Sequence, residues 1–315
     1  MIKNTSTQPL LVVCGPTASG KTGLGIDLAL EFGGEIISAD SMQVYKTMDI
    51  GTAKPTHEEK RGVPHHLIDI LTPDETFSVA QYAKLARETI ADIHTRGKLP
   101  ILVGGTGLYI NGVVDNISYA EVPEDKSLRE RLRESARQHG NEAMLNRLRC
   151  IDPELSETLH PNNIGRIIRA IEVWELTGEP MSTWQKRSRE TPAPYNLCML
   201  GLTFKDRSLL YGRIEKRVDI MLQIGLIDEV KLLQKSGFLD ATACTASQAI
   251  AYKEFFDYLS GKQSLADAIS HLKQQTRRYA KRQLTWFRRD ERIHWLYMDN
   301  PYDDVLMEAR AAINN

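Results

Sequence analysis

Short apolar runs alternate with helically spaced apolar residues in the N-terminal part of the chain. Residues 24–30 and 77–94 place their apolar side chains at the spacing of an amphipathic helix. Runs typical of buried strands cover residues 10–13, 34–39, 66–71 and 99–103. Strands that alternate with helices predict an α/β fold with a parallel, doubly wound sheet.

The pattern changes after residue 114. Strand-like runs give way to charged helical stretches over residues 115–194, so we expect a helical insertion domain there, carried by a core of residues 1–114 and 195–315. Residues 195–202 should form the last strand of the sheet. Helices are predicted at residues 126–139, 142–149, 164–177, 208–235, 246–258, 264–289 and 302–312.

Composition narrows the function only slightly. The 315 residues are 42% hydrophobic and 26% charged, and the formal net charge of -1 gives no global attraction to nucleic acid. No apolar run approaches the roughly 20 residues that span a bilayer, and residues 1–9 lack the apolar core of a signal peptide. We therefore expect a cytoplasmic protein with no membrane partner. Without a C-x-x-C pair, a zinc finger is not expected from Cys14, Cys150, Cys198 and Cys244.

A phosphate-binding loop directly follows the first predicted strand. The motif G-x-x-x-x-G-K-[ST] lies between a strand and a helix, which is the context that it requires. Backbone N–H groups would hold phosphate oxygens, Lys21 would neutralise the terminal phosphates, and Thr22 would place its hydroxyl on Mg²⁺. A nucleoside triphosphate such as ATP is the default occupant, but any diphosphate ester fits. The loop consists of Gly15, Pro16, Thr17, Ala18, Ser19, Gly20, Lys21 and Thr22.

Two further strand ends carry candidate chemistry. Asp40 follows the second predicted strand, and Gly104–Gly107 follow the fourth. Because the carboxyl ends of parallel strands share one edge of a sheet, we expect both to converge with the phosphate loop. Asp40 is then a magnesium ligand, a general base or a cap for the long loop 41–55, and the glycines form either a close approach to a ligand or a turn. No hydrophobic strand ends in Asp-Glu here, which argues against ATP hydrolysis.

A cationic helix is predicted near the C-terminus. Residues 271–292 contain eight Lys and Arg residues against two acids. A helix face of one charge sign suggests a polyanionic partner, although a solvated surface helix is the alternative. One half of the helix carries Arg277, Arg278, Lys281, Arg282, Arg288 and Arg289, and the other half carries Leu272, Tyr279, Ala280, Trp286 and Phe287.

Several stretches resemble one family, the bacterial-type tRNA dimethylallyltransferases, also called tRNA isopentenyltransferases. The matching stretches run in the family's order over nearly the whole chain, with residues 115–160 and the C-terminal end matching loosely. They are GPTASGKT (15–22), ADSMQVYKTMDIGTAKP (39–55), GVPHHLIDI (62–70), GGTGLY (104–109), RIIRAIEV (166–173), RIEKRVDIML (213–222), AIAYKE (249–254) and RRYAKRQLTWFR (277–288).

The resemblance implies a reaction and its partners. A dimethylallyl group would pass from dimethylallyl diphosphate to N6 of the adenosine 3′ to the anticodon, in tRNAs that read codons beginning with U. Mg²⁺ and an insertion domain that grips the anticodon stem-loop are also implied, and a monomer is expected. By resemblance, Lys21 and Arg217 neutralise the departing diphosphate, with Arg213 the weaker candidate, and Asp40 accepts the proton of the attacking amine.

The resemblance also implies a set of tRNA contacts. Ser41, Met42 and Gln43 match the segment that lines the flipped-out adenine beside Asp40, and Thr106 matches a catalytic residue that contacts the target nucleotide. The remaining matches are Arg129, Gly165, Arg166, Ile167, Ile168, Arg169, Gln248, Tyr252, Lys253, Arg278, Lys281 and Arg282.

Two residues depart from the family's pattern. Ala251 stands where Gly is usual, and a backbone with positive φ there would make Ala cost on the order of 1 kcal/mol. Gly165 stands where a polar side chain is common, which puts one RNA contact in doubt.

Three alternatives compete with this interpretation. A phosphate-loop kinase explains residues 15–22 but not the cationic helix. A transferase that prenylates free adenine nucleotides would need neither that helix nor the insertion. An RNA-binding module with an unused loop is disfavoured because Lys21, Thr22 and Asp40 are intact.

Overall fold

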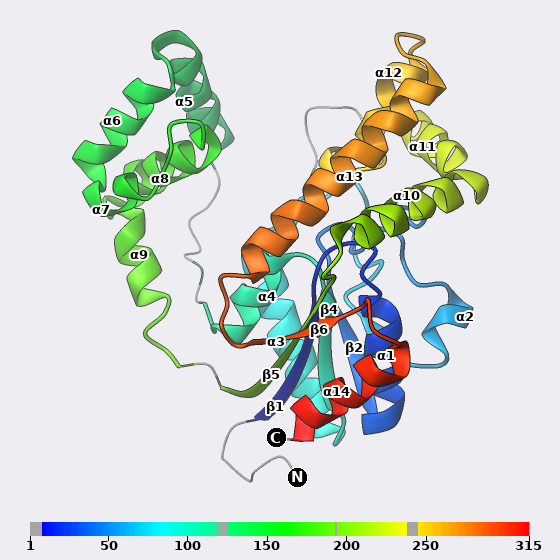
Figure 1. Ribbon diagram of the computed structural model, residues 1–315. Helices are drawn as coiled ribbons and strands as arrows, with labels where there is room; N and C mark the ends of the chain where they lie inside the picture. The colour runs from blue at the N-terminus through cyan, green and yellow to red at the C-terminus, as the bar shows by residue number, and fades with distance from the viewer. Residues whose placement is uncertain (1–7, 118, 120–124, 193, 238–244, 315) are drawn as a thin grey trace. The chain divides into compact units, whose positions relative to one another are not determined.

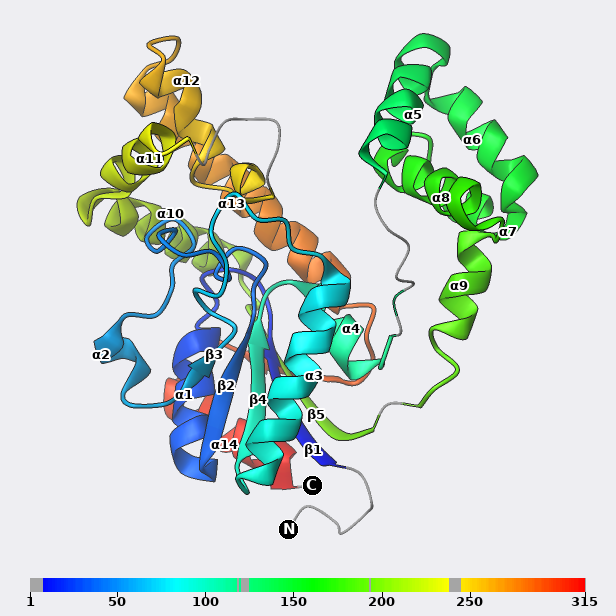
Figure 2. The same cartoon turned by 180° about the vertical axis from the view of Figure 1, so that it is seen from behind.

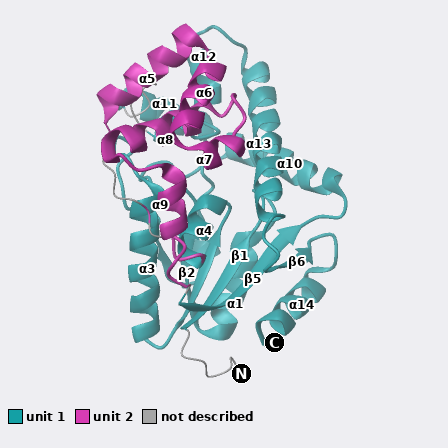
Figure 3. Cartoon of the chain, turned by 90° about the vertical axis from the view of Figure 1, so that its left-hand side faces the viewer, with its two compact units in different colours: residues 1–114, 194–315 teal, residues 115–193 magenta. Residues whose placement is uncertain are grey.

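The computed structural model describes residues 8–117, 119, 125–192, 194–237 and 245–314. Cys244 lies outside these residues. The chain divides into two compact units, one made of Met1–Val114 with Pro194–Asn315 and the other of Asp115–Ala193 (Figure 3). Among the described residues, no helix combines the length and the apolar character needed to cross a bilayer.

A parallel sheet organises the first unit, and the α/β prediction is confirmed. In the described part of the chain the sheet has six strands in the order β3-β2-β4-β1-β5-β6, and every neighbouring pair is parallel. The strands are β1 (Gln8–Cys14), β2 (Gly34–Ala39), β3 (His65–His66), β4 (Leu99–Gly104), β5 (Tyr195–Thr203) and β6 (Ile293–Tyr297).

Helices cover both faces of this sheet (Figures 1 and 2). Successive side chains of a strand point to opposite faces, so Val12 packs with α3 (Val79–Thr95) and α4 (Gly107–Val114). Its neighbour Val13 packs with α1 (Lys21–Phe32) and α14 (Tyr302–Asn314). Both valines are fully buried. The core therefore has two apolar layers that hold the sheet rigid beneath its carboxyl edge.

Two strand predictions were wrong. The strand predicted at residues 66–71 is only His65–His66, because Leu67 and Asp69 have φ of 60° and 58°, which an extended strand does not allow. The strand at Tyr195–Thr203 is not the last, since β6 pairs with its outer edge. β6 is a short edge strand that follows a charged segment, so its apolar pattern is weak.

The C-terminal helices depart from the predicted pattern at two residues with positive φ. The single helix predicted at 208–235 is α10 (Arg207–Gln223) and α11 (Leu226–Lys235), separated at Gly225 with φ of 104°. The helix predicted at 246–258 is interrupted at Ala251, where φ is 84°. That segment holds 3₁₀ turns at Ala246–Gln248 and Lys253–Phe255 and the short α12 (Phe256–Leu259). The long cationic helix is α13 (Leu265–Phe287), close to its prediction.

Ala251, where the family usually has glycine, shows how such a replacement is accommodated. Ala251 adopts positive φ, so its Cβ carries the strain that a glycine would avoid. Its N–H donates to Glu254 Oε2 at 2.9 Å, which holds the turn. Gly165 is exposed, and a Cβ added there would meet nothing within 4 Å.

The second unit is a helical bundle with its own apolar core. Leu132, Leu148 and Ile171 are among the buried residues that its helices share. The helices are α5 (Lys126–His139), α6 (Asn141–Ile151), α7 (Pro153–Glu157), α8 (Ile164–Thr177) and α9 (Met181–Arg187). The first unit also contains the short α2 (His57–Lys60), which begins with a capping box at Thr56.

Candidate functional site

The carboxyl ends of three adjacent strands lie in register. Ala39 pairs with Gly104, and Gly104 pairs with Cys14, so the loops that follow β2, β4 and β1 leave the sheet side by side. They border a cavity of about 310 Å³ whose other walls come from α10, residues 248–253 and α13. The convergence predicted from topology is confirmed.

The phosphate loop needs its glycines. Gly15 has φ of 141°, and a Cβ there would lie 2.7 Å from the carbonyl oxygen of Leu202 on β5. Gly20 has φ of 97° at the start of α1. These backbone angles let the loop wrap closely over the end of β1 and bring the first turn of α1 to the cavity, which Thr17, Lys21 and Thr22 line.

Two cations and one carboxylate share the cavity. Lys21, Arg217 and Asp40 all line it. Burial, together with the charge of Arg217, lowers the pKa of Lys21 to about 8, while Asp40 opposes that shift. Burial likewise lowers the pKa of Arg217. Two cations that line one cavity define a place that favours a multiply charged anion.

The contacts of Lys21 and Arg213 complete the loop's surroundings. Lys21 Nζ donates to the carbonyl oxygen of Pro16 at 2.6 Å, so its ammonium group curls back over the loop. Arg213, one turn before Arg217 on α10, is exposed, and its Nε donates to the carbonyl oxygen of Ala18 at 2.9 Å. Arg213 thus braces the outside of the loop, and Arg217 faces the cavity.

Asp40 caps the turn after β2 and also faces the cavity. Its Oδ1 accepts the N–H of Met42 at 2.9 Å and that of Gln43 at 3.4 Å. Within the described chain these hydrogen bonds use only Oδ1. Asp40 therefore caps the turn through Oδ1, which leaves Oδ2 available for a second role in the cavity that Asp40 lines.

Thr106 is not among the residues that line the cavity, and it bonds to Ser41, the residue after Asp40. Its Oγ1 accepts the N–H of Ser41 at 3.1 Å and lies 3.5 Å from Ser41 Oγ. The phenol of Tyr279 on α13, which lines the cavity, is hydrogen-bonded to Thr106 and Gln283. Sequence reasoning placed Tyr279 on the buried side of its helix and missed its position at the site.

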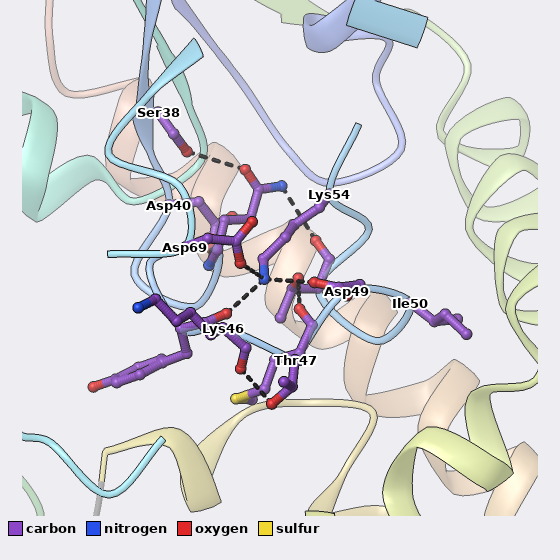
Figure 4. A network of polar contacts seen from close by, with 12 residues as sticks. Ser38, Asp40, Lys46, Thr47, Asp49, Ile50, Lys54 and Asp69 are labelled. Atoms are coloured by element: carbon purple, nitrogen blue, oxygen red, sulfur yellow. Dashed lines mark hydrogen bonds and ion pairs between the residues drawn. The ribbon is translucent and has the colours of Figure 1, made fainter. Parts of the chain in front are cut away.

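Polar contacts hold loop 41–55 around the cavity (Figure 4). Gln43 accepts from Ser38 Oγ at 3.0 Å, and its Nε2 donates to the carbonyl oxygens of Thr52 and Ala53, each at 3.3 Å. Lys54, only 6% exposed, is held by two carboxylates and one carbonyl oxygen. Those partners are Asp49, Asp69 and Tyr45.

Glu229 on α11 fastens the same loop from outside. Its carboxylate accepts three backbone N–H groups, those of Asp49, Ile50 and Gly51, at 2.8 to 3.0 Å. The hydroxyl of Tyr252 also donates to it at 2.7 Å. Tyr252 is 0% exposed, so its side chain supports the loop, and its expected tRNA contact stays a prediction.

We expect Glu229→Ala to loosen this loop. Removing the carboxylate leaves three N–H groups and a buried phenol without their acceptor, so the free energy of unfolding should fall by about 2 kcal/mol. Hydrogen exchange of the amides at 49–51 should accelerate. The matched control is Asp228→Ala, because Asp228 is the neighbouring, largely exposed acid on α11. Equal amide protection in both variants would contradict the role of Glu229.

Four cations of the predicted basic face, and Lys273 one turn before them on α13, differ in their surroundings. Arg278, Lys281 and Arg282 are exposed, and Arg282 also lines the cavity. Lys273 pairs with Asp219 at 2.6 Å and Arg277 with Glu215 at 2.6 Å, both acids on α10. The exposed cationic face of α13 is therefore narrower than predicted, because acids on α10 pair with part of it.

The remaining predictions for this helix have mixed outcomes. Leu272, Ala280 and Phe287 are buried as predicted. Trp286 is 42% exposed, so its placement on the inward face was wrong, and its Nε1 donates to Asn111 Oδ1 at 2.8 Å. The helix ends at Phe287, so Arg288 and Arg289 follow it rather than extend its face.

Two further residues predicted to contact tRNA lie before α13. Gln248 and Lys253 are exposed and line the cavity.

In the second unit, the residues predicted to contact RNA divide into two groups. Gly165 and Arg166 are exposed at the start of α8. The side chains of Ile167 and Ile168 are 0% and 5% exposed and fill the bundle core, and the contacts of these residues with RNA stay a prediction. Glu172, fully buried, accepts from Arg129 and Arg169 at 2.8 Å each. This ion pair orients both guanidinium groups.

The cavity suits a hard cation that completes its coordination with a substrate. The described residues contain no cluster of three or more His, Cys, Asp or Glu side chains that would hold a metal alone. Thr22 and Asp40 nevertheless present oxygen donors to the same cavity. Mg²⁺ usually takes one or two protein oxygens with phosphate oxygens and water, so this donor set fits it.

Comparison with known proteins gives one consistent result. The model of a family described as IPP transferase matches residues 43–290. The tRNA dimethylallyltransferase of Carboxydothermus hydrogenoformans is 51% identical over 312 residues, covering 98% of this chain and 99% of the relative. That of Thermoanaerobacter sp. (strain X514) is 51% identical over 292 residues, covering 92% of each chain.

Solved structures agree with this result. The full-length tRNA isopentenylpyrophosphate transferase of Bacillus halodurans superposes with a TM-score of 0.72 at 46% identity, covering 98% of this chain and 97% of that one. A eukaryotic dimethylallyltransferase acting on tRNA superposes with a TM-score of 0.82 at 30% identity, covering 97% of this chain and 78% of the other.

Proposed function

This chain belongs to the IPP transferase family, and from that premise we propose that it transfers a dimethylallyl group from dimethylallyl diphosphate to N6 of a tRNA adenosine. The target is the adenosine 3′ to the anticodon in tRNAs that read codons beginning with U. The relatives at about half identity over nearly the full chain support this reaction. The proposal includes a monomeric, cytoplasmic enzyme.

The observation that carries the proposal is the meeting of Lys21, Arg217 and Asp40 in one cavity at the strand ends. The amides of the phosphate loop and Lys21 hold the diphosphate, and Arg217 offsets the negative charge that grows on it as the allylic C–O bond breaks. Thr22 would hold Mg²⁺, which would further neutralise the charge of the leaving group.

Asp40 acts on the other reactant. The lone pair of an adenine N6 amine is delocalised into the ring, so the amine attacks carbon only as its proton leaves. The carboxylate of Asp40 accepts that proton, and its bonds to Met42 and Gln43 keep it fixed at the end of β2. Thr106 holds the residue after Asp40, because its hydroxyl oxygen accepts the N–H of Ser41.

The target base must leave its stack to reach this cavity. Loop nucleotides unstack at low cost, and a flipped base is read by contacts in a pocket. Ser41, Met42 and Gln43 line the cavity beside Asp40. Arg278, Lys281 and Arg282, which are exposed on α13, contact phosphates of the RNA in this proposal, and the second unit binds the anticodon stem-loop.

The direct test is incubation with an anticodon stem-loop and labelled dimethylallyl diphosphate. Label should appear on the adenosine 3′ to the anticodon and not on a stem-loop carrying another base there. Label on free adenosine monophosphate in place of RNA would favour the free-nucleotide transferase. Transfer of phosphate from ATP to a small acceptor would favour the kinase.

The exposed cations of α13 should dominate the salt dependence of RNA binding. Arg278→Ala combined with Arg282→Ala is expected to weaken binding and to reduce the slope of log K against log salt by roughly 0.7 to 0.9 per lost phosphate contact. The control changes Lys273 and Arg277 to Ala, since both are paired with acids on α10. An unchanged slope in the first variant would return α13 to a solvated surface helix.

A further inference from the structure

One buried glutamine links the cationic helix to both loops of the site. Gln283 on α13 is 6% exposed. Its Oε1 accepts the N–H of Thr17 in the phosphate loop at 2.8 Å, and its Nε2 donates to the carbonyl oxygen of Gly105, after β4, at 3.0 Å. The partners lie 266 and 178 positions away in the sequence.

The local backbone is built around this side chain. A Cβ on Gly105 would lie 2.1 Å from Gln283 Nε2, so only glycine lets the amide approach its carbonyl. An amide is the group that donates and accepts at once from a single planar end. A leucine at position 283 would neither donate nor accept a hydrogen bond. A carboxylate there would accept from Thr17 but would turn a lone pair toward the carbonyl oxygen of Gly105, which needs a donor. The bridge therefore depends on the chemistry of glutamine and not on its volume.

Gln283 also lines the cavity that holds Lys21 and Arg217. Thr17 lies in the phosphate loop and lines the cavity, so its position sets the spacing of the N–H donors that follow it. A loop tied at Thr17 to both α13 and β4 enters binding with little remaining freedom, and less entropy is lost when the anion is ordered.

We propose that Gln283 is a positioning residue for the diphosphate, fixing the phosphate loop against the loop after β4. The inference rests on the proposed function, because it takes the anion in this loop to be the diphosphate of the prenyl donor. Gln283 makes no bond with the reacting atoms. Its loss should therefore appear as weaker diphosphate binding, with stem-loop binding preserved.

The experiment compares Gln283→Leu, Gln283→Glu and the control Gln274→Leu, which changes an exposed glutamine of the same helix. Calorimetry measures the Kd of inorganic diphosphate with Mg²⁺ at pH 8 and pH 5.5. We expect Gln283→Leu to raise that Kd about tenfold at both pH values, with the stem-loop Kd within about twofold of wild type. Gln274→Leu should match wild type throughout.

Gln283→Glu adds a second measurement, the change of its diphosphate Kd with pH, which a residue that only filled space would not show. At pH 8 its buried carboxylate repels the Gly105 oxygen, and the Kd should rise as in Gln283→Leu. At pH 5.5 burial favours the protonated acid, which donates to Gly105 and accepts from Thr17, so the ratio of variant to wild-type Kd should fall back toward one. If Gln283→Leu does not fold, this ratio carries the test.

Two results would overturn the inference. One is a folded Gln283→Leu enzyme that binds inorganic diphosphate as wild type does. The other is a Gln283→Glu ratio that stays the same at both pH values. Failure of the proposed function looks different, because wild type itself would then fail to bind dimethylallyl diphosphate or would transfer nothing to the stem-loop.

Discussion

Asp40→Asn is expected to lower kcat by about 10² or more, with the stem-loop Kd within about twofold of wild type. An asparagine oxygen still accepts the N–H groups of Met42 and Gln43, so the turn after β2 keeps its cap. What is lost is the carboxylate that takes the N6 proton in the proposed mechanism. Single-turnover transfer of labelled dimethylallyl to a stem-loop measures this directly, without interference from product release.

Asp40→Ala removes the cap as well as the base, so its comparison with Asp40→Asn separates the two roles. Equal losses in both variants would show that the missing base accounts for the effect. The matched control is Asp69→Asn, which changes an exposed acid bonded to Lys54 in the same loop region. Turnover close to wild type in Asp40→Asn would remove Asp40 from the base role.

Arg217→Ala should lower kcat/KM for dimethylallyl diphosphate by about 10². The guanidinium lines the cavity and is close enough to Lys21 to lower the pKa of that lysine. In the proposed mechanism, it therefore faces the charge that accumulates on the departing diphosphate. Steady-state kinetics with the stem-loop held saturating measures the loss.

Arg213→Ala is the sharpest comparison, because Arg213 stands one turn away on α10 but is exposed and braces the loop through Ala18. We expect a loss of less than about fivefold there, and none in Lys216→Ala, which changes an exposed cation between the two. A larger loss in Arg213→Ala than in Arg217→Ala would reverse the two assignments.

The errors of sequence reasoning share a physical cause. Leu67 and Asp69 sit in an apolar run, but their backbone has positive φ, and hydrophobic periodicity carries no information about φ. In the sequence, Glu229 resembles any acid on the exposed side of a helix. In the structure its carboxylate accepts three N–H groups of a loop that is distant in the chain. Tyr252, which is buried, donates its hydroxyl to the same carboxylate, a contact that the sequence did not indicate.

By itself, the sequence determined the alternation of strands and helices, the phosphate loop at the end of the first strand, and Asp40 at the end of the second. Each of these is a local pattern, in which spacing and glycine placement set the backbone. The tertiary structure alone decided that Tyr279 and Gln283 join the cavity, that Gln283 bridges two loops, and that Arg277 pairs with Glu215. Those choices arise from packing between segments far apart in the chain, where helical spacing predicts a face but not what covers it.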